Sequence, residues 1–567
     1  MSTKNYCLFI AAFFFFLFAF SISAQTSRPN VSRVQTFDVQ HYILRVNFDR
    51  DSKILFGDTT IQLKPLKTDF KSIELDAADL EFESVKLENS NKDLTYRLGG
   101  EKIFITLDKA YSPDDLISVR LKYSTKPRKG VYFVDAIEKD GKISRAAQVW
   151  SQGEAEESHF WFPGYDFPDD KATSEEFITV AKGETAIGNG ELLETLENPD
   201  GTKTFHYKIL VPHSSYLTSF VVGTYTKVPD TYKNIALGYY VYPDKTALAQ
   251  SAYGKTKEMM RVYEQLTGVD FPYNKYDQTM VAQFQFGGME NITATTMADS
   301  EIIFADFDFG KNVVEDLVSH ELAHSWFGNL VTCKNWSELW LNEGFATFME
   351  AAYREKMYGR EDYLRKINED AATFIIADAR SRKRPPLFNP QAEPITLFDE
   401  PEFIYQKGGA VIHTLRETVG TENFWKAINL YLNRHKFQNV ESPDLQKAME
   451  ETSAMNLDWF FSQWVYGAGF PKLNVKQAYN PTTKTLSLTV TQTQKLDKTT
   501  PSVFILPLDV EIITAKGVKT EKIEVKKRLE TFLIKLDGKP REVEIDKDLK
   551  IPLKSVKLLP LNSPKSR

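Results

Sequence analysis

Two hydrophobic patterns divide the chain into successive regions. From about residue 33 to residue 228, apolar residues recur at every second position, as in residues 42–48, and a polar turn at residues 49–53 interrupts the alternation. Further apolar runs occupy residues 54–56, 103–105 and 117–121, and Asp, Asn, Gly and Pro separate them. Alternation with a period of two residues is the signal of half-buried strands, so this region is predicted to form an antiparallel β domain built from hairpins.

The pattern changes near Leu248, and until about Tyr466 the apolar residues follow the period of an α-helix. The helical runs occupy residues 255–266, 313–327, 337–357, 411–419 and 424–433. After Gly469 the alternation returns, in residues 486–490, 504–513 and 531–536. This last region has about a hundred residues, the size of a small β-sandwich.

A chain of 567 residues is too long for a single hydrophobic core, so several domains are expected. We predict a multidomain α+β protein in four segments. These are a signal peptide at 1–24, an N-terminal β domain at 25–227, a mainly helical domain at 228–468 and a C-terminal β-sandwich at 469–567.

The first 24 residues have the pattern of a secretory signal peptide. Lys4 precedes an unbroken apolar run from Cys7 to Phe20, and small residues lead to a mature start at Gln25. The alternative is an uncleaved membrane anchor, but the run is shorter than the roughly 20 residues that a spanning helix needs. We expect an exported protein, periplasmic, cell-surface or secreted, with no membrane span in its mature chain.

Composition and charge narrow the choice of partners. Hydrophobic residues make up 42% and charged residues 26%, and the net charge of −7 is spread along the chain without a basic stripe. A nucleic-acid partner is therefore not expected.

Cys333 is the only cysteine after residue 24, so no internal disulfide is expected. A packing thiol is the simpler interpretation of Cys333, because no partner histidine stands in a recognisable context.

The segment His320–His324 reads HELAH, a motif that binds zinc from a helix. Residues four apart on a helix face the same way, so His320 and His324 can present two imidazoles to one cation. Glu321 points to one side of this face, where it can hold a proton. The helix is expected to end at Gly328–Asn329.

Zinc needs a third protein ligand, and Glu343 is the candidate. It lies in the helical run that begins near Ser337, whose hydroxyl is expected to cap the first turn. The alternative is a chance match in which two ordinary histidines lie in a packed core. Since the chain has only eight histidines, that match is improbable, and we predict one Zn²⁺ per chain.

A pair of glycines followed by a carboxylate precedes the zinc motif by about thirty residues. Gly287 and Gly288 would let another backbone approach closely, as when a peptide strand adds to a sheet edge. Glu290 beside them would be partly desolvated and would suit the cationic amine of a free peptide N-terminus. Gly-Gly alone, however, is more simply explained as a turn.

The chain resembles the gluzincin aminopeptidases, the family of aminopeptidase N and leukotriene hydrolase. The motifs that carry the resemblance are, in order, the run from Gly287 to Asn291, the segment His320–His324, and Glu343. The likeness covers residues 33–475 in motif order. It implies a saddle-like N-terminal β domain, a thermolysin-like catalytic domain and a C-terminal β-sandwich. It also implies peptide substrates with a free N-terminus.

The resemblance assigns further site residues that the sequence alone would not. Gln152–Ala155 matches the family motif whose acidic residue, here Glu154, shares the substrate amine with Glu290. Residues 405–409 match the family's tyrosine motif, with Tyr405 as the oxyanion donor. Met289 and Gln152 are implied as pocket walls. Without the resemblance, Glu154 would be assigned to a solvated acidic loop and Tyr405 to the hydrophobic core.

These residues together predict metal-assisted amide hydrolysis in which Glu321 takes and returns the proton and Tyr405 stabilises the oxyanion. Anchoring of the amine by Glu290 and Glu154 would restrict cleavage to the first peptide bond. Two alternatives stay open: a zinc endopeptidase without an amine anchor, and a non-catalytic module on the same fold. A second hydrolase activity, such as the epoxide opening of leukotriene hydrolase, is not indicated by these residues.

Overall fold

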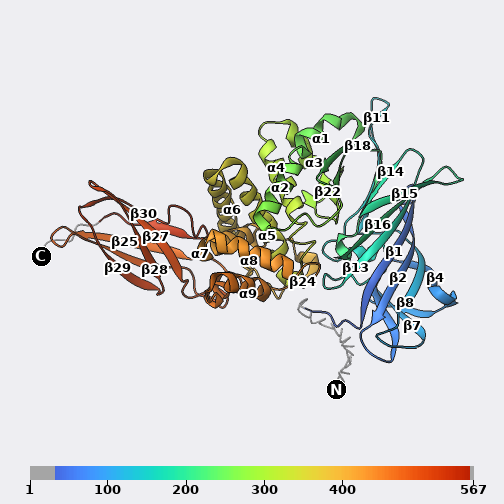
Figure 1. Ribbon diagram of the computed structural model, residues 1–567, viewed down its shortest axis with the longest axis horizontal. Helices are drawn as coiled ribbons and strands as arrows, with labels where there is room; N and C mark the ends of the chain where they lie inside the picture. The colour runs from blue at the N-terminus through green and yellow to red at the C-terminus, as the bar shows by residue number, and fades with distance from the viewer. Residues whose placement is uncertain (1–31, 562–567) are drawn as a thin grey trace, which may run out of the picture.

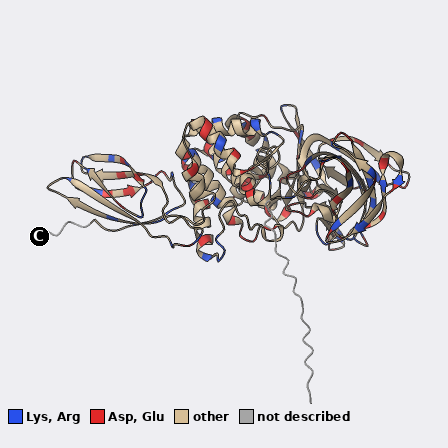
Figure 2. Cartoon of the chain, turned by 90° about the horizontal axis from the view of Figure 1, so that it is seen from below, with Lys and Arg blue, Asp and Glu red and all other residues tan. Residues whose placement is uncertain are grey.

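The computed structural model describes residues 32–561, and the predicted signal peptide at 1–24 lies outside this range. Three parts follow one another along the long axis of the molecule, and Figure 1 shows them from the N-terminal β-sheets through a helical middle part to a C-terminal β part. The predicted multidomain α+β architecture is confirmed. Among residues 32–561, no helix is both long and apolar enough to cross a bilayer. Lys and Arg are interspersed with Asp and Glu over all three parts (Figure 2).

The N-terminal part is built on an eight-stranded sheet with the strand order β15-β16-β13-β1-β2-β8-β4-β5. Its strands are β1 (Phe37–Asp49), β2 (Ile54–Pro65), β4 (Glu81–Leu87), β5 (Lys92–Asp93), β8 (Ile117–Thr125), β13 (Lys171–Val180), β15 (Glu191–Glu197) and β16 (Lys203–Ser214). The prediction of a purely antiparallel domain is wrong at one place, because β1 and β13 pair in parallel. The long stretch of chain between them supplies the crossover that a parallel pair needs.

Smaller sheets complete this part. They contain β3 (Phe70–Asp76), β6 (Thr95–Leu98) and β7 (Lys102–Tyr111); β9 (Val131–Val134), β12 (Gln148–Ser151), β14 (Thr185–Gly188) and β17 (Phe220–Gly223); and the hairpin of β10 (Ile137–Lys139) and β11 (Lys142–Arg145). The loop that follows β12 carries Gln152 and Glu154, and this loop brings the N-terminal part to the candidate site.

The middle part opens with a five-stranded sheet that the hydrophobic pattern did not predict. Its order is β18 (Thr226–Tyr232), β19 (Ile235–Val241), β20 (Lys275–Val281), β22 (Ala294–Ala298) and β21 (Gly288–Met289). β20 is buried on both faces although its sequence, KYDQTMV, is largely polar, and this hid it from an alternation test. β21 is the last strand of the sheet and carries the glycine pair at its edge. The predicted domain boundary after residue 227 falls within β18.

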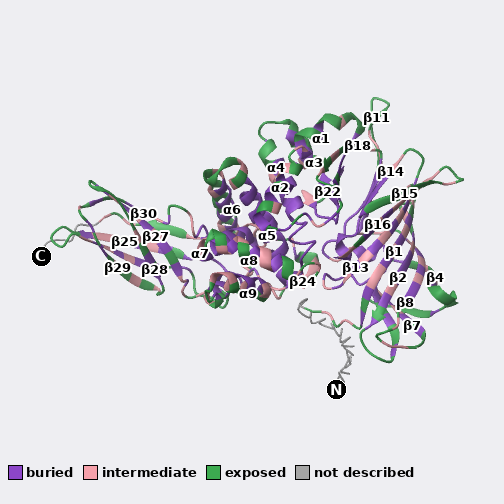
Figure 3. Cartoon of the chain, in the orientation of Figure 1, coloured by how far each residue is buried: buried purple, intermediate pink, exposed green. Residues whose placement is uncertain are grey.

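Ten helices are described in the middle part. They are α1 (Thr246–Tyr253), α2 (Thr256–Thr267), α3 (Asp299–Ile302), α4 (Lys311–Ala323), α5 (Trp340–Tyr358), α6 (Arg360–Arg380), α7 (Tyr405–Val419), α8 (Thr421–Arg434), α9 (Ser442–Ser453) and α10 (Asp458–Trp464). A two-stranded bridge of β23 (Thr332–Cys333) and β24 (Asn439–Val440) joins two loops beside them. Every residue of α5 from Trp340 to Arg354 is buried, so α5 forms the centre of this core (Figure 3).

Two predicted details of the zinc-motif helices are wrong. α4 ends at Ala323 rather than near Gly328, because the backbone N–H of Asn329 bonds back to the carbonyl of His324 and a tight turn replaces the last helical turn. Ser337 does not cap the second helix, since α5 begins at Trp340. Ser337 lies instead in a 3₁₀ turn, where the side chain of Asn335 accepts a bond from the Ser337 N–H at 3.1 Å.

The C-terminal part has two sheets, as a β-sandwich requires. One contains β25 (Lys472–Asn480), β26 (Thr485–Gln492), β29 (Leu529–Lys535) and β31 (Ser555–Leu558), and the other β27 (Leu506–Thr514), β28 (Gly517–Val525) and β30 (Pro540–Ile545). Alternating buried residues along β26 and β27 face the interior. This part lies at the end of the molecule opposite the N-terminal sheets (Figure 1).

Candidate metal centre and active site

Three predicted ligands come together where α4 ends and α5 begins. Nε2 of His320 lies 3.2 Å and Nε2 of His324 lies 3.3 Å from the Oε2 atom of Glu343. One ligand atom from each residue lies within 4.8 Å of the other two, and all three side chains are buried. Two imidazoles and a carboxylate around one point are a set that zinc accepts, with a fourth position left for water or substrate.

The second nitrogen of each imidazole is held by the protein. Nδ1 of His320 lies 2.8 Å from Oε1 of Glu350, and Nδ1 of His324 lies 2.9 Å from the carbonyl oxygen of Phe327. Both oxygens accept, so each Nδ1 donates its hydrogen, and Nε2 is the nitrogen of each ring that faces Glu343 and would ligate a metal. Hydrogen bonds of this kind fix the ring orientation that metal binding needs.

The electrostatics of this point favour a positive charge. Burial alone would lower the pKa of His320, but its hydrogen bonds with Glu343 and Glu350 outweigh burial and raise the pKa to about 9. Burial alone would raise the pKa of Glu343, but His324 and His320 lower it to about 2. A buried carboxylate that stays ionised between two imidazoles fits a divalent cation, so the residues present fit zinc.

Glu350 is a site residue that the sequence reasoning missed. Its second oxygen, Oε2, lies 2.8 Å from Nζ of Lys366, which in turn lies 2.8 Å from Oδ1 of Asp370. A signal for it existed, because Glu350 follows Glu343 by seven residues and therefore lies on the same face of α5 two turns later. Lys366 and Asp370 belong to α6, which the hydrophobic pattern did not predict.

Glu321 lies beside the edge of the five-stranded sheet. A methyl group at Gly288 would collide with the carboxylate of Glu321, so only glycine allows this approach. Burial raises the pKa of Glu321 to about 8, although the nearby imidazoles act in the opposite direction. A carboxylate that exchanges a proton near neutral pH, next to a strand edge where a peptide can add, suits a general base.

Two further carboxylates approach the metal ligands from the other side. One oxygen each of Glu154, Glu290 and Glu343 lie within 4.8 Å of one another. Glu154 and Glu290 are buried, and Oε1 of each has no hydrogen-bond partner among the described residues. Burial raises the pKa of Glu154 well above its usual range and also raises that of Glu290, and the neighbouring carboxylates add to both shifts. Buried, unsatisfied carboxylate oxygens are costly unless a cationic ligand pairs with them.

The two predicted wall residues touch one another. Nε2 of Gln152 lies 3.2 Å from the sulfur of Met289. Met289 lines the cavity in front of the metal ligands, whereas Gln152 packs behind it and is not among the lining residues. Gln152 therefore contacts the cavity wall indirectly, through Met289 and through the carbonyl of Glu154 at 3.5 Å.

Tyr405 opens α7 and faces the metal ligands. Its ring stacks on the imidazole of His320, with ring centroids 5.8 Å apart and an interplanar angle of 12°. Burial raises the pKa of Tyr405 well above its usual range, and Glu343 adds to this, so the hydroxyl keeps its proton and remains a donor. α7 lies close to α5 because glycines face each other, and a methyl group at Gly344 would lie 2.9 Å from the Cα atom of Gly408.

These groups surround one cavity of about 370 Å³, a size typical of ligand sites. The cavity collects Glu154, Gly287, Gly288, Met289, Glu290, His320, Glu321, His324, Glu343 and Tyr405 from separate parts of the chain. Phe286, Leu317 and Phe398 add apolar surface, and the rings of Phe286 and Phe398 are in edge contact, with centroids 5.4 Å apart. Of the predicted site residues, only Gln152 lies outside the lining.

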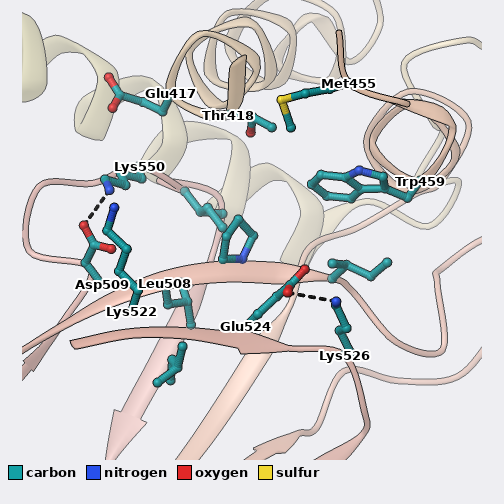
Figure 4. Close-up of a pocket in the computed structure, with 14 residues that line it drawn as sticks. Glu417, Thr418, Met455, Trp459, Leu508, Asp509, Lys522, Glu524, Lys526 and Lys550 are labelled. Atoms are coloured by element: carbon teal, nitrogen blue, oxygen red, sulfur yellow. Dashed lines mark hydrogen bonds and ion pairs between the residues drawn. The ribbon is translucent and has the colours of Figure 1, made fainter. Parts of the chain in front are cut away.

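A second cavity, of about 500 Å³, lies between the helices of the middle part and the C-terminal sheets (Figure 4). Its charged groups largely neutralise each other, since Lys550 lies 2.5 Å from Asp509 and Lys526 lies 2.8 Å from Glu524. It shares no residue with the first cavity and contains none of the metal-ligand clusters found among residues 32–561.

A two-histidine, one-carboxylate centre with a buried glutamate next to it, set beside a free sheet edge, defines a metallopeptidase type of active site. Comparison with known protein families also indicates a peptidase. The Peptidase M1 N-terminal domain matches residues 38–217, and the Peptidase family M1 domain matches residues 251–464. The chain belongs to peptidase family M1, which confirms the predicted resemblance to gluzincin aminopeptidases.

The curated relatives that match this chain have low sequence identity to it and are longer than it is. Aminopeptidase 2 of Candida albicans is 26% identical over 452 residues, which cover 78% of this chain and 48% of that protein. Glutamyl aminopeptidase of Bos taurus is 31% identical over 366 residues, and aminopeptidase N of Streptomyces lividans is 30% identical over 337 residues. These two alignments cover 63% and 58% of this chain but only 37% and 39% of the relatives. The chain thus spans about half the length, or less, of these curated relatives.

Proposed function

We propose that this protein is a zinc-dependent aminopeptidase that hydrolyses the first peptide bond of peptides with a free N-terminus. The observation that carries the proposal is a pair of buried oxygens next to Glu343, Oε1 of Glu154 and Oε1 of Glu290, neither of which has a hydrogen bond among the described residues. A protonated amine satisfies both oxygens through charge-assisted hydrogen bonds. An amine held there has its first peptide bond close to the metal ligands, which restricts cleavage to that bond.

His320, His324 and Glu343 would hold one Zn²⁺, which when bound polarises the scissile carbonyl and makes water a better nucleophile at neutral pH. Glu321 takes the proton of the attacking water and delivers it to the leaving amine. Tyr405 donates its hydroxyl hydrogen to the carbonyl oxygen as negative charge develops there. β21 offers its free edge to the substrate backbone, and Gly288 leaves room for Glu321 beside it.

The names of the relatives support this proposal independently of the site. All three of the relatives compared above are called aminopeptidases, from a yeast, a mammal and a bacterium. Their specificities differ by name, and glutamyl aminopeptidase indicates an acidic first residue in one of them. The proposal for this chain therefore covers the reaction and the free amine but not the preferred first residue.

The deciding experiment compares amino-acid amidomethylcoumarins with a free and with an N-acetylated amine, with and without chelator. We expect turnover of the free amines only, loss of turnover with chelator, and recovery with zinc. In the variant Glu290→Gln, kcat/KM for the free amine should fall by roughly 10- to 100-fold, because a charge-assisted bond to the amine is worth about 1.5–3 kcal/mol. Glu258→Gln, which changes a half-buried carboxylate on α2 that pairs with Arg261, is the matched control.

Two results would overturn the proposal. Internal cleavage of N-acetylated peptides would identify an endopeptidase, which shares the metal centre but needs no amine anchor. If the protein binds zinc stoichiometrically but hydrolyses no substrate with a free amine, it is a non-catalytic binding module.

We also propose that residues 1–24 direct export and are then removed. N-terminal sequencing of the protein recovered outside the cytoplasm should begin at Gln25. A mature protein that retains residues 1–24 in a membrane fraction would establish an anchor instead.

A further inference from the structure

The segment before α4 exposes an unusual group of aromatic rings. Among Ile303–Phe309, which we call the aromatic loop, Phe304, Phe307 and Phe309 are 37%, 49% and 75% exposed. The rings lie together, with the centroids of Phe307 and Phe309 5.5 Å apart and those of Phe304 and Phe309 5.9 Å apart. Large apolar groups gathered at a surface in this way mark a binding surface more often than chance exposure.

The aromatic loop is continuous with the candidate active site along one face of α4. Phe309, Val313 and Leu317 follow one another at intervals of four residues and end at Glu321. Val313 is 57% exposed, and Leu317 is half-buried at the wall of the active-site cavity. A strip of apolar side chains therefore runs from the cavity to the aromatic loop.

The sheet edge sets the direction in which a bound peptide leaves the cavity. With its amine at Glu290, a peptide that adds to β21 runs backward along that strand, past Gly288 and then past Gly287. Gly287 lies against Leu317, since a methyl group there would be 3.0 Å from Cδ1 of Leu317. The residues beyond the cleaved bond are thus delivered to the start of the apolar strip.

We propose that Leu317, Val313, Phe307 and Phe309 bind apolar side chains in the downstream part of a peptide substrate. Glu321 and Val313 are eight residues apart on α4, which corresponds to about 12 Å along the helix and to roughly four residues of extended peptide. Phe309 lies just before the start of α4 at Lys311 and extends the strip beyond Val313. The strip therefore selects peptides with apolar side chains at about their third to sixth residues. This inference rests on the proposed aminopeptidase function, because that function places the amine at Glu290.

A peptide suits the strip better than a membrane or a second copy of the chain. The aromatic loop contains Asp306 and Asp308, and the nearby cation Lys311 is already paired with Asp308 at 2.7 Å. Anionic lipid surfaces attract segments rich in Lys and Arg, which this loop is not. The exposed parts of the three rings offer roughly 400 Å² at most, well below the roughly 800 Å² per partner of a stable dimer.

The test uses two ten-residue peptides that share their first two residues. One has Leu and Phe at positions three to six, and the other has Ser and Gln there. For the wild-type protein we expect kcat/KM to be on the order of ten times higher for the apolar peptide, through KM, because burial of about 60 Å² of apolar surface, at about 25 cal/mol per Å², corresponds to that factor. In the double variant Phe307→Ser/Phe309→Ser, the ratio between the two peptides should fall severalfold toward one, because only Leu317 and Val313 of the strip are left.

The control is Leu210→Ser, which changes a side chain that is 73% exposed on β16 and away from α4. It should keep the wild-type ratio. A wild-type ratio of one, or a ratio that persists in the double variant, would overturn the inference. So would a double variant that alters sedimentation or vesicle binding and leaves the peptide ratio unchanged.

Failure of the proposed function is recognised separately. If the wild-type protein does not hydrolyse any free amino-acid amidomethylcoumarin, the aminopeptidase assignment is wrong. The strip is then tested by fluorescence anisotropy of the two labelled peptides in the presence of chelator. The same tenfold preference, and its severalfold fall in the double variant, would still be expected, and equal affinities would overturn the inference.

Discussion

Nδ1 of the predicted zinc ligand His320 lies 2.8 Å from Oε1 of Glu350, two turns beyond Glu343 on the same helix. Lys366 pairs with the other oxygen of Glu350 at 2.8 Å, so the ring of His320 is held through a chain of two charged groups. α5 therefore supplies one ligand directly and orients another. The metal centre therefore depends on α5 both for the ligand Glu343 and for the orientation of His320.

The first prediction concerns the role of this contact in metal affinity. Glu350→Gln keeps an acceptor for the Nδ1–H of His320 but loses the charge that pairs with Lys366. Zinc affinity should fall by about 10- to 100-fold, as for other partners of metal-bound histidines. Competition with a fluorescent chelator measures this. Glu355→Gln, one turn further along α5 and paired with Arg416, should bind zinc like the wild type, and an unchanged affinity in Glu350→Gln would contradict a positioning role.

The second prediction separates the hydroxyl of Tyr405 from its ring. Tyr405→Phe keeps the ring that stacks on His320 and removes only the donor. We expect kcat to fall by about 100- to 1000-fold with little change in KM or zinc affinity, because the donor acts on charge that develops during the reaction. Tyr431→Phe removes another buried hydroxyl, one that has no hydrogen-bond partner among the described residues, and should leave kcat unchanged. A rise in KM or a fall in zinc affinity as large as the fall in kcat would assign Tyr405 a structural role instead.

The third prediction concerns the close approach of α5 and α7. In Gly408→Ala the new methyl carbon would lie 2.7 Å from the Cα atom of Gly344, so the helices must separate. The free energy of unfolding should fall by about 1–3 kcal/mol, the usual cost of overpacking. kcat should fall as well, because α7 carries Tyr405. Gly538→Ala adds a methyl group in open space and serves as the control in thermal unfolding.

The fourth prediction concerns a buried carboxylate far from the metal ligands. Burial raises the pKa of Glu176 to about 8, and its Oε1 atom has no hydrogen-bond partner among residues 32–561. The folded state therefore holds a proton that the unfolded chain releases near its ordinary pKa of 4.5. This contribution to stability is fully present below pH 4.5 and is lost as the pH rises toward 8.

Glu176→Gln should remove this dependence. The variant and the wild type should have similar free energies of unfolding near pH 5, and at pH 8 the variant should be more stable by up to a few kcal/mol. Denaturant titrations at both pH values check this. Equal stabilities at pH 8 would show that Glu176 is solvated or paired when ionised. Glu83→Gln is the control, because Glu83 is exposed on β4 and has no partner among the ion pairs of the described residues.

Short-range patterns predicted the strands and helices whose apolar residues have a clear period. The alternation at residues 42–48 became β1, and the helical period around His320 became α4. The prediction was poorer where burial does not follow the local pattern. β20 is polar in sequence but buried on both faces, and α6 is highly charged but carries Lys366 into the interior. Part of the pairing is local, Lys275 with Asp277 and Lys366 with Asp370. The other partners, the carbonyl of Gly188 and the carboxylate of Glu350, come from other elements of the fold, which a short window of sequence does not contain.

The chemistry of the metal ligands is local, because His320 and His324 are one helical turn apart and Glu343 follows on the next helix. That is why these three could be assigned from spacing. The amine anchor is not local: Glu154 follows a strand of the N-terminal part and Glu290 an edge strand of another sheet, yet their oxygens lie within 4.8 Å of a common partner, Glu343. Only the packing of one domain on the other brings these carboxylates together. They repel one another when buried, and this repulsion is tolerated because the rest of the fold holds them in place.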